Sequence, residues 1–192
     1  MPQQSNWRFC MKCNAMFYAG YQGGVCSAGG THTAQGILFN LPYGFPASGN
    51  AQDNWRFCVK CNVMFFDGYS GGKCAAGGTH TAQGLMFILP HDVVVASTTQ
   101  NNWRFCQSCN AMFFAGYVGG ICPAGGRHSA QGYNFVLPFT EANSGYTLII
   151  GINPSAVKYG EVRSGDNPGH TIVAFRDSSE FANLIWPPLK GF

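Results

Sequence analysis

The chain has 192 residues, 46% hydrophobic and 15% aromatic, which is enough apolar material for a folded protein. Only 10% of the residues are charged, and the net charge of +3 is too small for the clustered basic surface typical of nucleic-acid-binding proteins. The 26 glycines disfavour helices and favour a β-rich chain. No apolar run approaches the roughly 18 residues that a membrane-spanning helix needs.

The first ten residues do not resemble a secretory signal peptide. The segment at residues 1–10 has neither a basic start nor an apolar stretch. We therefore expect a cytoplasmic protein, a protein exported without a leader, or a chain that has already been trimmed.

Three tandem repeats, here called repeats 1, 2 and 3, occupy residues 6–42, 54–90 and 102–138. They begin 48 residues apart, and 24 of their 37 positions are identical in all three copies. Eleven residues join each repeat to the next. Joins of equal length predict three units that are either stacked or arranged about a pseudo-threefold axis.

Each repeat carries the pattern Cys-x2-Cys-x12-Cys-x5-His. Three thiolates and one imidazole are a typical donor set for a closed, tetrahedral, structural Zn²⁺ site. A 37-residue unit is also too small to fold on its apolar core alone and usually needs a metal or disulfides. The expected ligands of three zinc ions are Cys10, Cys13, Cys26 and His32; Cys58, Cys61, Cys74 and His80; and Cys106, Cys109, Cys122 and His128.

Two other uses of the cysteines are less favoured. Disulfides would leave one of the three cysteines in each repeat without a partner in that repeat, and would not explain the histidine. A redox C-x-x-C motif usually lies in a βαβ context, which this sequence lacks. A closed four-ligand site leaves no position for a catalytic water, and no common catalytic motif is present, so we expect no enzyme activity.

The residues around the first two cysteines predict a β-hairpin folded over the metal. Trp7 and Phe9 precede the C-x-x-C pair of repeat 1, and Phe17 follows it. Asn14, directly after the second cysteine, tolerates the left-handed backbone that such a turn often needs. We expect Trp7 and Phe9 to form a small core over the zinc, with Arg8 on the opposite face of the strand.

Residues 145–192 contain no cysteine and read as a β-rich segment, either a cap for the repeats or an assembly surface. Strands are expected at 146–152, 158–162 and 171–175, and Val93–Val95 could add a short strand in the second join. The predicted fold class is therefore all-β, with three tandem zinc-ribbon-like β-hairpin units and a C-terminal β-rich segment.

The phrase W-R-F-C-x-x-C-x-x-M-F-F-x-G-Y-x-G-G-x-C-x-A-G-G-x-H resembles a tandem Cys3His repeat of bacterial, especially actinobacterial, and fungal proteins. That repeat often occurs beside extracellular or carbohydrate-related modules. The resemblance covers the three repeats and implies a small zinc-ribbon-like module.

Some residues are identical in all repeats although neither the metal nor a turn requires them. Exposed rings beside amide and guanidinium groups suit sugar recognition, and three weak sites would gain from avidity. We therefore predict a non-enzymatic, multivalent, lectin-like binding module for a glycan or cell-surface ligand. The candidate ligand contacts are Arg8, Tyr21 and Gln35; Arg56, Tyr69 and Gln83; and Arg104, Tyr117 and Gln131.

Two alternatives remain at this point. Low charge and many aromatics also suit a self-assembling subunit of a filament, shell or toxin complex, which would form a homo-oligomer. Nucleic-acid binding is less favoured, because repeat 3 has Ser108 where Lys12 and Lys60 stand in the other two repeats.

Overall fold

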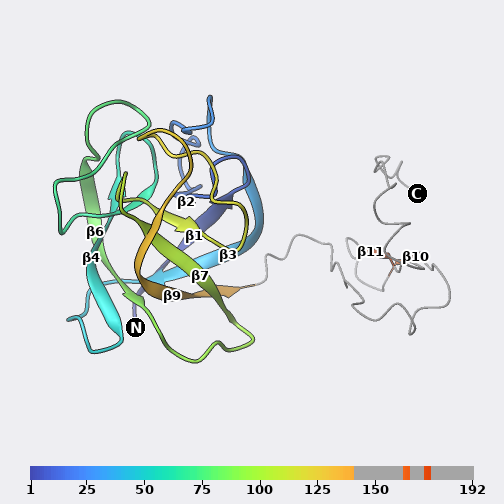
Figure 1. Ribbon diagram of the computed structural model, residues 1–192. Coiled ribbons are helices and arrows are strands. Elements are labelled where there is room, and N and C mark those ends of the chain that lie inside the picture. Colours follow the sequence, from blue (N-terminus) through green and yellow to red (C-terminus); the bar gives the residue numbers. More distant parts are fainter. Residues whose placement is uncertain (141–161, 165–170, 174–192) are drawn as a thin grey trace. The chain divides into compact units, whose positions relative to one another are not determined.

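The computed structural model describes residues 1–140, 162–164 and 171–173 of the chain. The chain divides into two compact units, Met1–Ala142 and Asn143–Phe192. All the regular secondary structure in the described residues is β-strand, so the predicted all-β class is confirmed (Figure 1). Within the same ranges, no helix is long and apolar enough to cross a membrane.

Each repeat forms three antiparallel strands, with its first strand in the middle. The short second strand folds back over the C-x-x-C turn and pairs Trp7 with Tyr18 and Phe9 with Met16, which confirms the predicted hairpin. The strands are β1 (Gln3–Cys10), β2 (Met16–Tyr18) and β3 (Ala34–Pro42) in repeat 1; β4 (Ala51–Cys58), β5 (Met64–Phe66) and β6 (Ala82–Pro90) in repeat 2; and β7 (Thr99–Cys106), β8 (Met112–Phe114) and β9 (Ala130–Thr140) in repeat 3.

The three repeats close into a ring of pseudo-threefold symmetry (Figure 1). At the cysteine-bearing end, Phe17 of repeat 1 bridges to Val63 of repeat 2. At the other end, Tyr43 bridges to Phe87 of repeat 2. The equivalent pairs are Phe65–Ala111, Phe113–Ala15, His91–Phe135 and Phe139–Phe39. Because repeat 3 returns to repeat 1, a linear stack is excluded.

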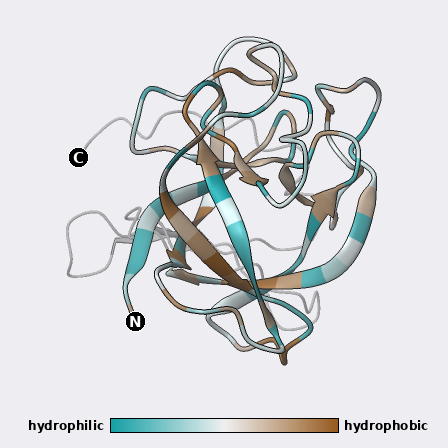
Figure 2. Ribbon diagram, turned by 90° about the vertical axis from the view of Figure 1, so that its left-hand side faces the viewer, coloured by the Kyte–Doolittle hydropathy of each residue, from teal (hydrophilic) through white to brown (hydrophobic). Residues whose placement is uncertain are grey.

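The alternation of side chains along the central strands creates two separate apolar regions. One face of β1 carries Trp7 and Phe9, and the other carries Arg8 and Cys10. The aromatic core comprises Trp7, Phe9, Met16, Phe39 and Leu41 with their counterparts in repeats 2 and 3. The cysteine layer comprises the nine cysteines, Ala15, Val63, Ala111, Phe17, Phe65 and Phe113. Figure 2 shows both hydrophobic and hydrophilic stretches along the strands.

The expected small core over each zinc is wrong in one respect. Trp7 and Phe9 both lie in the aromatic core and not in the cysteine layer. The Trp7 ring contacts Phe57 and Phe87 of repeat 2, at centroid distances of 6.3 and 5.1 Å. A single repeat is too small to cover an indole completely, so the next repeat supplies the covering rings. Arg8 does lie on the opposite face, as predicted.

The buried indole of each repeat finds its hydrogen-bond acceptor just outside the predicted repeat boundary. Trp7 Nε1 donates to Gln4 Oε1 at 3.1 Å, and a left-handed Asn6 (φ 68°) shifts the strand register between them. This pairing satisfies an N–H group that would otherwise be buried without a partner. The equivalent pairs are Trp55–Gln52 and Trp103–Gln100.

The strands expected in the second join and in the C-terminal segment agree only in part with those observed. Val93–Val95 form no strand, because Asp92 takes a left-handed backbone (φ 52°) and ends the pairing there. In the C-terminal unit, β10 (Val162–Ser164) pairs antiparallel with β11 (Thr171–Val173), close to two of the expected strands. The strand expected at residues 146–152 lies outside the described residues.

Candidate metal centre

The four predicted ligands of each repeat lie together and are buried. In repeat 1, Cys10 Sγ is 3.9 Å from Cys26 Sγ, and Cys13 Sγ is 3.5 Å from His32 Nδ1. All four ligand atoms lie within 4.8 Å of one another in every repeat. The matching thiol–imidazole distances are 3.4 Å for Cys61–His80 and for Cys109–His128.

These separations suit a tetrahedral zinc ion. With Zn–S near 2.3 Å and Zn–N near 2.0 Å, tetrahedral geometry places two sulfurs about 3.8 Å apart and sulfur and nitrogen about 3.5 Å apart. A disulfide would require sulfurs about 2.05 Å apart, and all nine cysteines are free. The repeats therefore form three structural zinc sites, each with a closed Cys3His donor set.

The ionisation of the neighbouring thiols in each cluster also favours a bound cation. A hydrogen bond from the Cys13 thiol lowers the pKa of Cys10 to about 3. Hydrogen bonds to the Cys10 and Cys26 sulfurs, together with burial, raise the pKa of Cys13 far above its usual range. Neighbouring thiols thus resist ionising together, and a doubly charged ion among them is what allows all three to become thiolates.

Two tight turns position the ligands of each site. In the first, the Asn14 N–H donates to Cys10 O at 2.8 Å, and Asn14 is left-handed (φ 61°), as the sequence predicted. In the second, the loop between β2 and β3 folds so that the His32 N–H donates to Gly23 O at 2.9 Å. This loop brings Cys26 and His32 back over the C-x-x-C pair.

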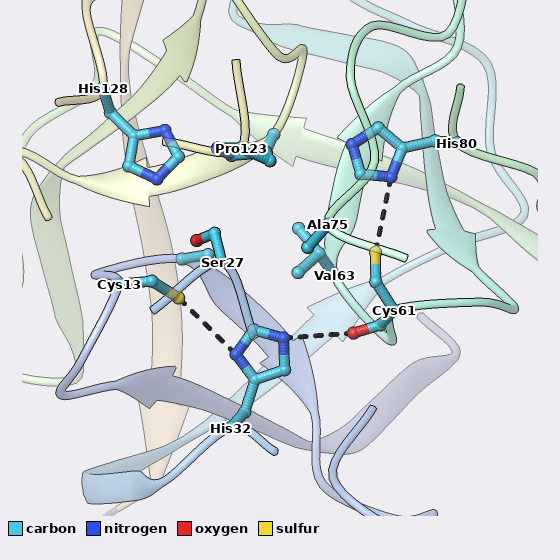
Figure 3. Close-up of a pocket in the computed structure, with 11 residues that line it drawn as sticks. Cys13, Ser27, His32, Cys61, Val63, Ala75, His80, Pro123 and His128 are labelled. Atoms are coloured by element: carbon cyan, nitrogen blue, oxygen red, sulfur yellow. Dashed lines mark hydrogen bonds between the residues drawn. The ribbon is translucent and has the colours of Figure 1, made fainter. Parts of the chain in front are cut away.

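Two of the three metal-site histidines also connect their site to the next repeat. His32 Nδ1 faces the cluster, so Nε2 carries the proton and donates to the Cys61 carbonyl at 3.1 Å (Figure 3). His80 donates in the same way to the Cys109 carbonyl at 3.1 Å. Such outer hydrogen bonds fix the tautomer and orientation of a metal-binding imidazole. At the third interface, His128 Nε2 is buried without a hydrogen-bond partner among the described residues.

The same carbonyl of Cys61 packs against a glycine of repeat 1. Gly24 has a left-handed backbone (φ 58°), and a Cβ at this position would collide with the Cys61 carbonyl oxygen. In the opposite direction, the Asn62 side-chain amide of repeat 2 donates to Gln22 O of repeat 1 at 2.9 Å. Each zinc knuckle is therefore held by the repeat before it as well as by its own loop.

A small pocket lies where the three sites face the pseudo-threefold axis (Figure 3). His32, His80 and His128 line it together with three small apolar residues, Ala15, Val63 and Ala111. Its lining belongs to the metal sites and to the residues packed on them.

The predicted sugar-contacting residues differ in exposure and in hydrogen bonding. Tyr21 is 64% exposed, and its ring contacts Tyr18 and, across the boundary, Phe57 of repeat 2. Gln35 is exposed, whereas Arg8 is half-buried and donates to Gly36 O at 2.6 Å. The guanidinium groups of Arg8 and Arg104 thus donate to backbone carbonyls of their own repeats, whereas the Tyr21 ring contacts the neighbouring repeat.

Sequence reasoning assigned no role to His91, which the structure places in a polar cluster at the boundary of repeats 2 and 3. Its ring stacks on Tyr133 at a centroid distance of 3.7 Å, and its Nδ1 lies 3.0 Å from Asp92 Oδ2. The hydrogen bond with His91 lowers the pKa of Asp92. The repeat pattern gave no signal for this cluster, because the counterparts of His91 are Tyr43 and Phe139.

Comparison with protein-family models, curated proteins and solved structures finds no match. The three Cys3His groups indicate zinc-binding tandem units, and no family is established for them.

Proposed function

We propose that this protein is a non-enzymatic, zinc-stabilised module that binds glycans at three equivalent sites. The observation that carries the proposal is the exposure of three tyrosines. Tyr21, Tyr69 and Tyr117 are 64, 65 and 63% exposed. Each of these rings still makes two aromatic contacts at centroid distances of 5.2 to 5.8 Å.

An exposed ring whose orientation is already fixed suits a weak polar ligand. Binding then costs little side-chain entropy, because the neighbouring rings hold the tyrosine before the ligand arrives. A tyrosine ring offers an apolar surface for the C–H groups of a sugar, and its hydroxyl offers a hydrogen bond. Three such sites on one ring of repeats would gain affinity for a polymer by avidity.

The zinc sites support a scaffold role in this proposal. Every cysteine and every histidine of the repeat motif belongs to a closed four-ligand set. Catalytic zinc keeps a coordination position open for water or substrate. We therefore assign the zinc ions to stability and the exposed aromatic residues to binding.

Depletion of the protein from solution by insoluble cellulose, chitin, xylan and peptidoglycan tests the proposal. We expect at least one polymer to retain the protein, and the triple variant Tyr21→Ala, Tyr69→Ala, Tyr117→Ala to lose at least about tenfold in affinity. The matched control replaces the exposed residues next to them, Gln22, Ser70 and Val118, with alanine. Equal retention of the triple variant and the wild type would contradict the proposal.

A self-assembling subunit is the second candidate, and one observation favours it. The second join exposes three successive valines, Val93–Val95, and Val94 is 92% exposed. An exposed apolar run of this kind is typical of a contact surface. Light scattering should then show an oligomer that Val94→Lys dissociates, and a monomer at high concentration would count against this role.

A further inference from the structure

The glutamine of each repeat and the tyrosine of the preceding repeat neighbour the same phenylalanine. Phe9 and Gln35 are opposite each other in the β1–β3 ladder. Residues opposite each other in an antiparallel pair present their side chains to the same face, with Cβ atoms about 5 Å apart. Phe9 in turn contacts Tyr117 of repeat 3, with a centroid distance of 5.8 Å.

The same juxtaposition occurs at all three boundaries. Tyr21 contacts Phe57 at 5.8 Å, and Phe57 is opposite Gln83. Tyr69 contacts Phe105 at 5.8 Å, and Phe105 is opposite Gln131. Each phenylalanine is 8–9% exposed, so it forms the floor between an exposed tyrosine and an exposed glutamine.

We infer that each glycan site is composite and lies across a repeat boundary, with the tyrosine from one repeat and the glutamine from the next. The inference rests on the proposed function and deepens it. The tyrosine supplies the stacking surface, and the glutamine amide supplies one donor and one acceptor for neighbouring polar groups of a pyranose ring. The three sites are Tyr117–Phe9–Gln35, Tyr21–Phe57–Gln83 and Tyr69–Phe105–Gln131.

This arrangement leaves the arginine outside the site. Arg8 lies on the face of β1 opposite Phe9, with Phe17 as its partner in β2. Its guanidinium is bonded to the Gly36 carbonyl, and the corresponding Arg104 donates to Gly132 O at 2.9 Å. The ligand set therefore reduces to tyrosine and glutamine, and Arg8 and Arg104 each donate to the carbonyl of a left-handed glycine in their own repeat.

A variant with a single remaining tyrosine decides between a composite site and a site within one repeat. In the Tyr21→Ala, Tyr69→Ala background, only Tyr117 remains. If the site is composite, adding Gln35→Ala lowers the remaining affinity for the retaining polymer about threefold to tenfold, and adding Gln131→Ala changes nothing. If the site lies within one repeat, Gln131→Ala has the effect and Gln35→Ala has none.

The outcomes separate this inference from the proposed function. A larger loss with Gln131→Ala, or equal effects of the two glutamine variants, overturns the composite site and leaves glycan binding standing. Failure of cellulose, chitin, xylan and peptidoglycan alike to retain the wild-type protein overturns both. Zinc content and far-UV circular dichroism should equal those of the wild type in every variant, because these side chains are exposed and outside the cysteine layer.

Discussion

The cysteine layer and the aromatic core join the same three repeats by different means. In the cysteine layer, neighbouring repeats meet through directional hydrogen bonds to backbone carbonyls, such as that from His32 to Cys61. In the aromatic core they meet through ring packing, such as that of Trp7 against Phe87. Directional hydrogen bonds require particular residues, whereas ring packing tolerates other apolar side chains of similar volume.

Sequence variation among the repeats is small in both regions, because Trp7, Phe9, Met16, Phe39 and Leu41 have identical counterparts and the cysteine layer changes only from Ala15 and Ala111 to Val63. The ligands, the asparagine after the second cysteine and the glycine that packs on the next knuckle are the same in every repeat. The aromatic core accepts tyrosine or phenylalanine at positions 18, 66 and 114. Four predictions separate the two regions experimentally.

Removing the zinc should have the largest effect and should unfold both regions. Structural zinc contributes an apparent binding free energy of about 10–16 kcal/mol in small finger peptides, which is comparable with the whole stability of a domain. A chelator under reducing conditions should therefore abolish the near-UV circular dichroism and make nine thiols reactive. Zn²⁺ should restore the signal and Mg²⁺ should not. Retention of the signal after complete metal loss would show that the aromatic core suffices.

Truncating an indole should weaken the aromatic core without emptying the metal sites. Trp55 is completely buried and lies outside the cysteine layer. Trp55→Ala should lower the free energy of unfolding by about 3–5 kcal/mol in urea, and Trp55→Phe should lower it less. The folded variant should still bind three zinc ions in a colorimetric assay. A loss of zinc in proportion to stability would mean that the two regions are not separable.

A glycine pair should isolate the contact between neighbouring repeats in the cysteine layer. Gly24 and Gly29 are both left-handed, but a Cβ meets the Cys61 carbonyl at Gly24 and nothing within 4 Å at Gly29. Gly24→Ala should lower the free energy of unfolding by about 2–4 kcal/mol, combining the clash with backbone strain. Gly29→Ala should cost only the strain, about 1–2 kcal/mol. Equal losses of unfolding free energy in the two variants would show that the contact between Gly24 and Cys61 adjusts to an added methyl group.

The smallest effect should come from a single hydrogen bond between repeats. Asn62→Gly keeps the left-handed backbone and removes the amide that donates to Gln22 O, so it should lower the free energy of unfolding by about 1 kcal/mol. Asn110 is the control, because its Nδ2 is buried without a partner among the described residues. Asn110→Gly should therefore cost less than Asn62→Gly in the same urea titration, and the reverse order would be inconsistent with the role given to this bond.

The local parts of this structure could be predicted from the sequence. The C-x-x-C hairpin, the left-handed Asn14 and the grouping of Cys10 with His32 all follow from spacing within one repeat. The equal joins indicated a ring as one of two arrangements.

Contacts between repeats could not be predicted in the same way. A repeated sequence looks the same whether Trp7 is covered by its own repeat or by Phe57 and Phe87 of the next one. The pairing of Tyr117 with Phe9 has the same ambiguity. The Gln4–Trp7 pair could have been found, because Gln52 and Gln100 occur at the same spacing.

The ring closure gives each repeat two different contact surfaces, one facing forward and one facing backward. Phe17 reaches forward to repeat 2, and Ala15 receives Phe113 of repeat 3. Head-to-tail contacts of this kind form a closed cycle when the rotation between units divides a full turn. One repeat together with one join, 48 residues in all, therefore carries both halves of the contact. Expressed alone with zinc, it should assemble as a homotrimer, in which three separate chains take the places that duplication has fused into one.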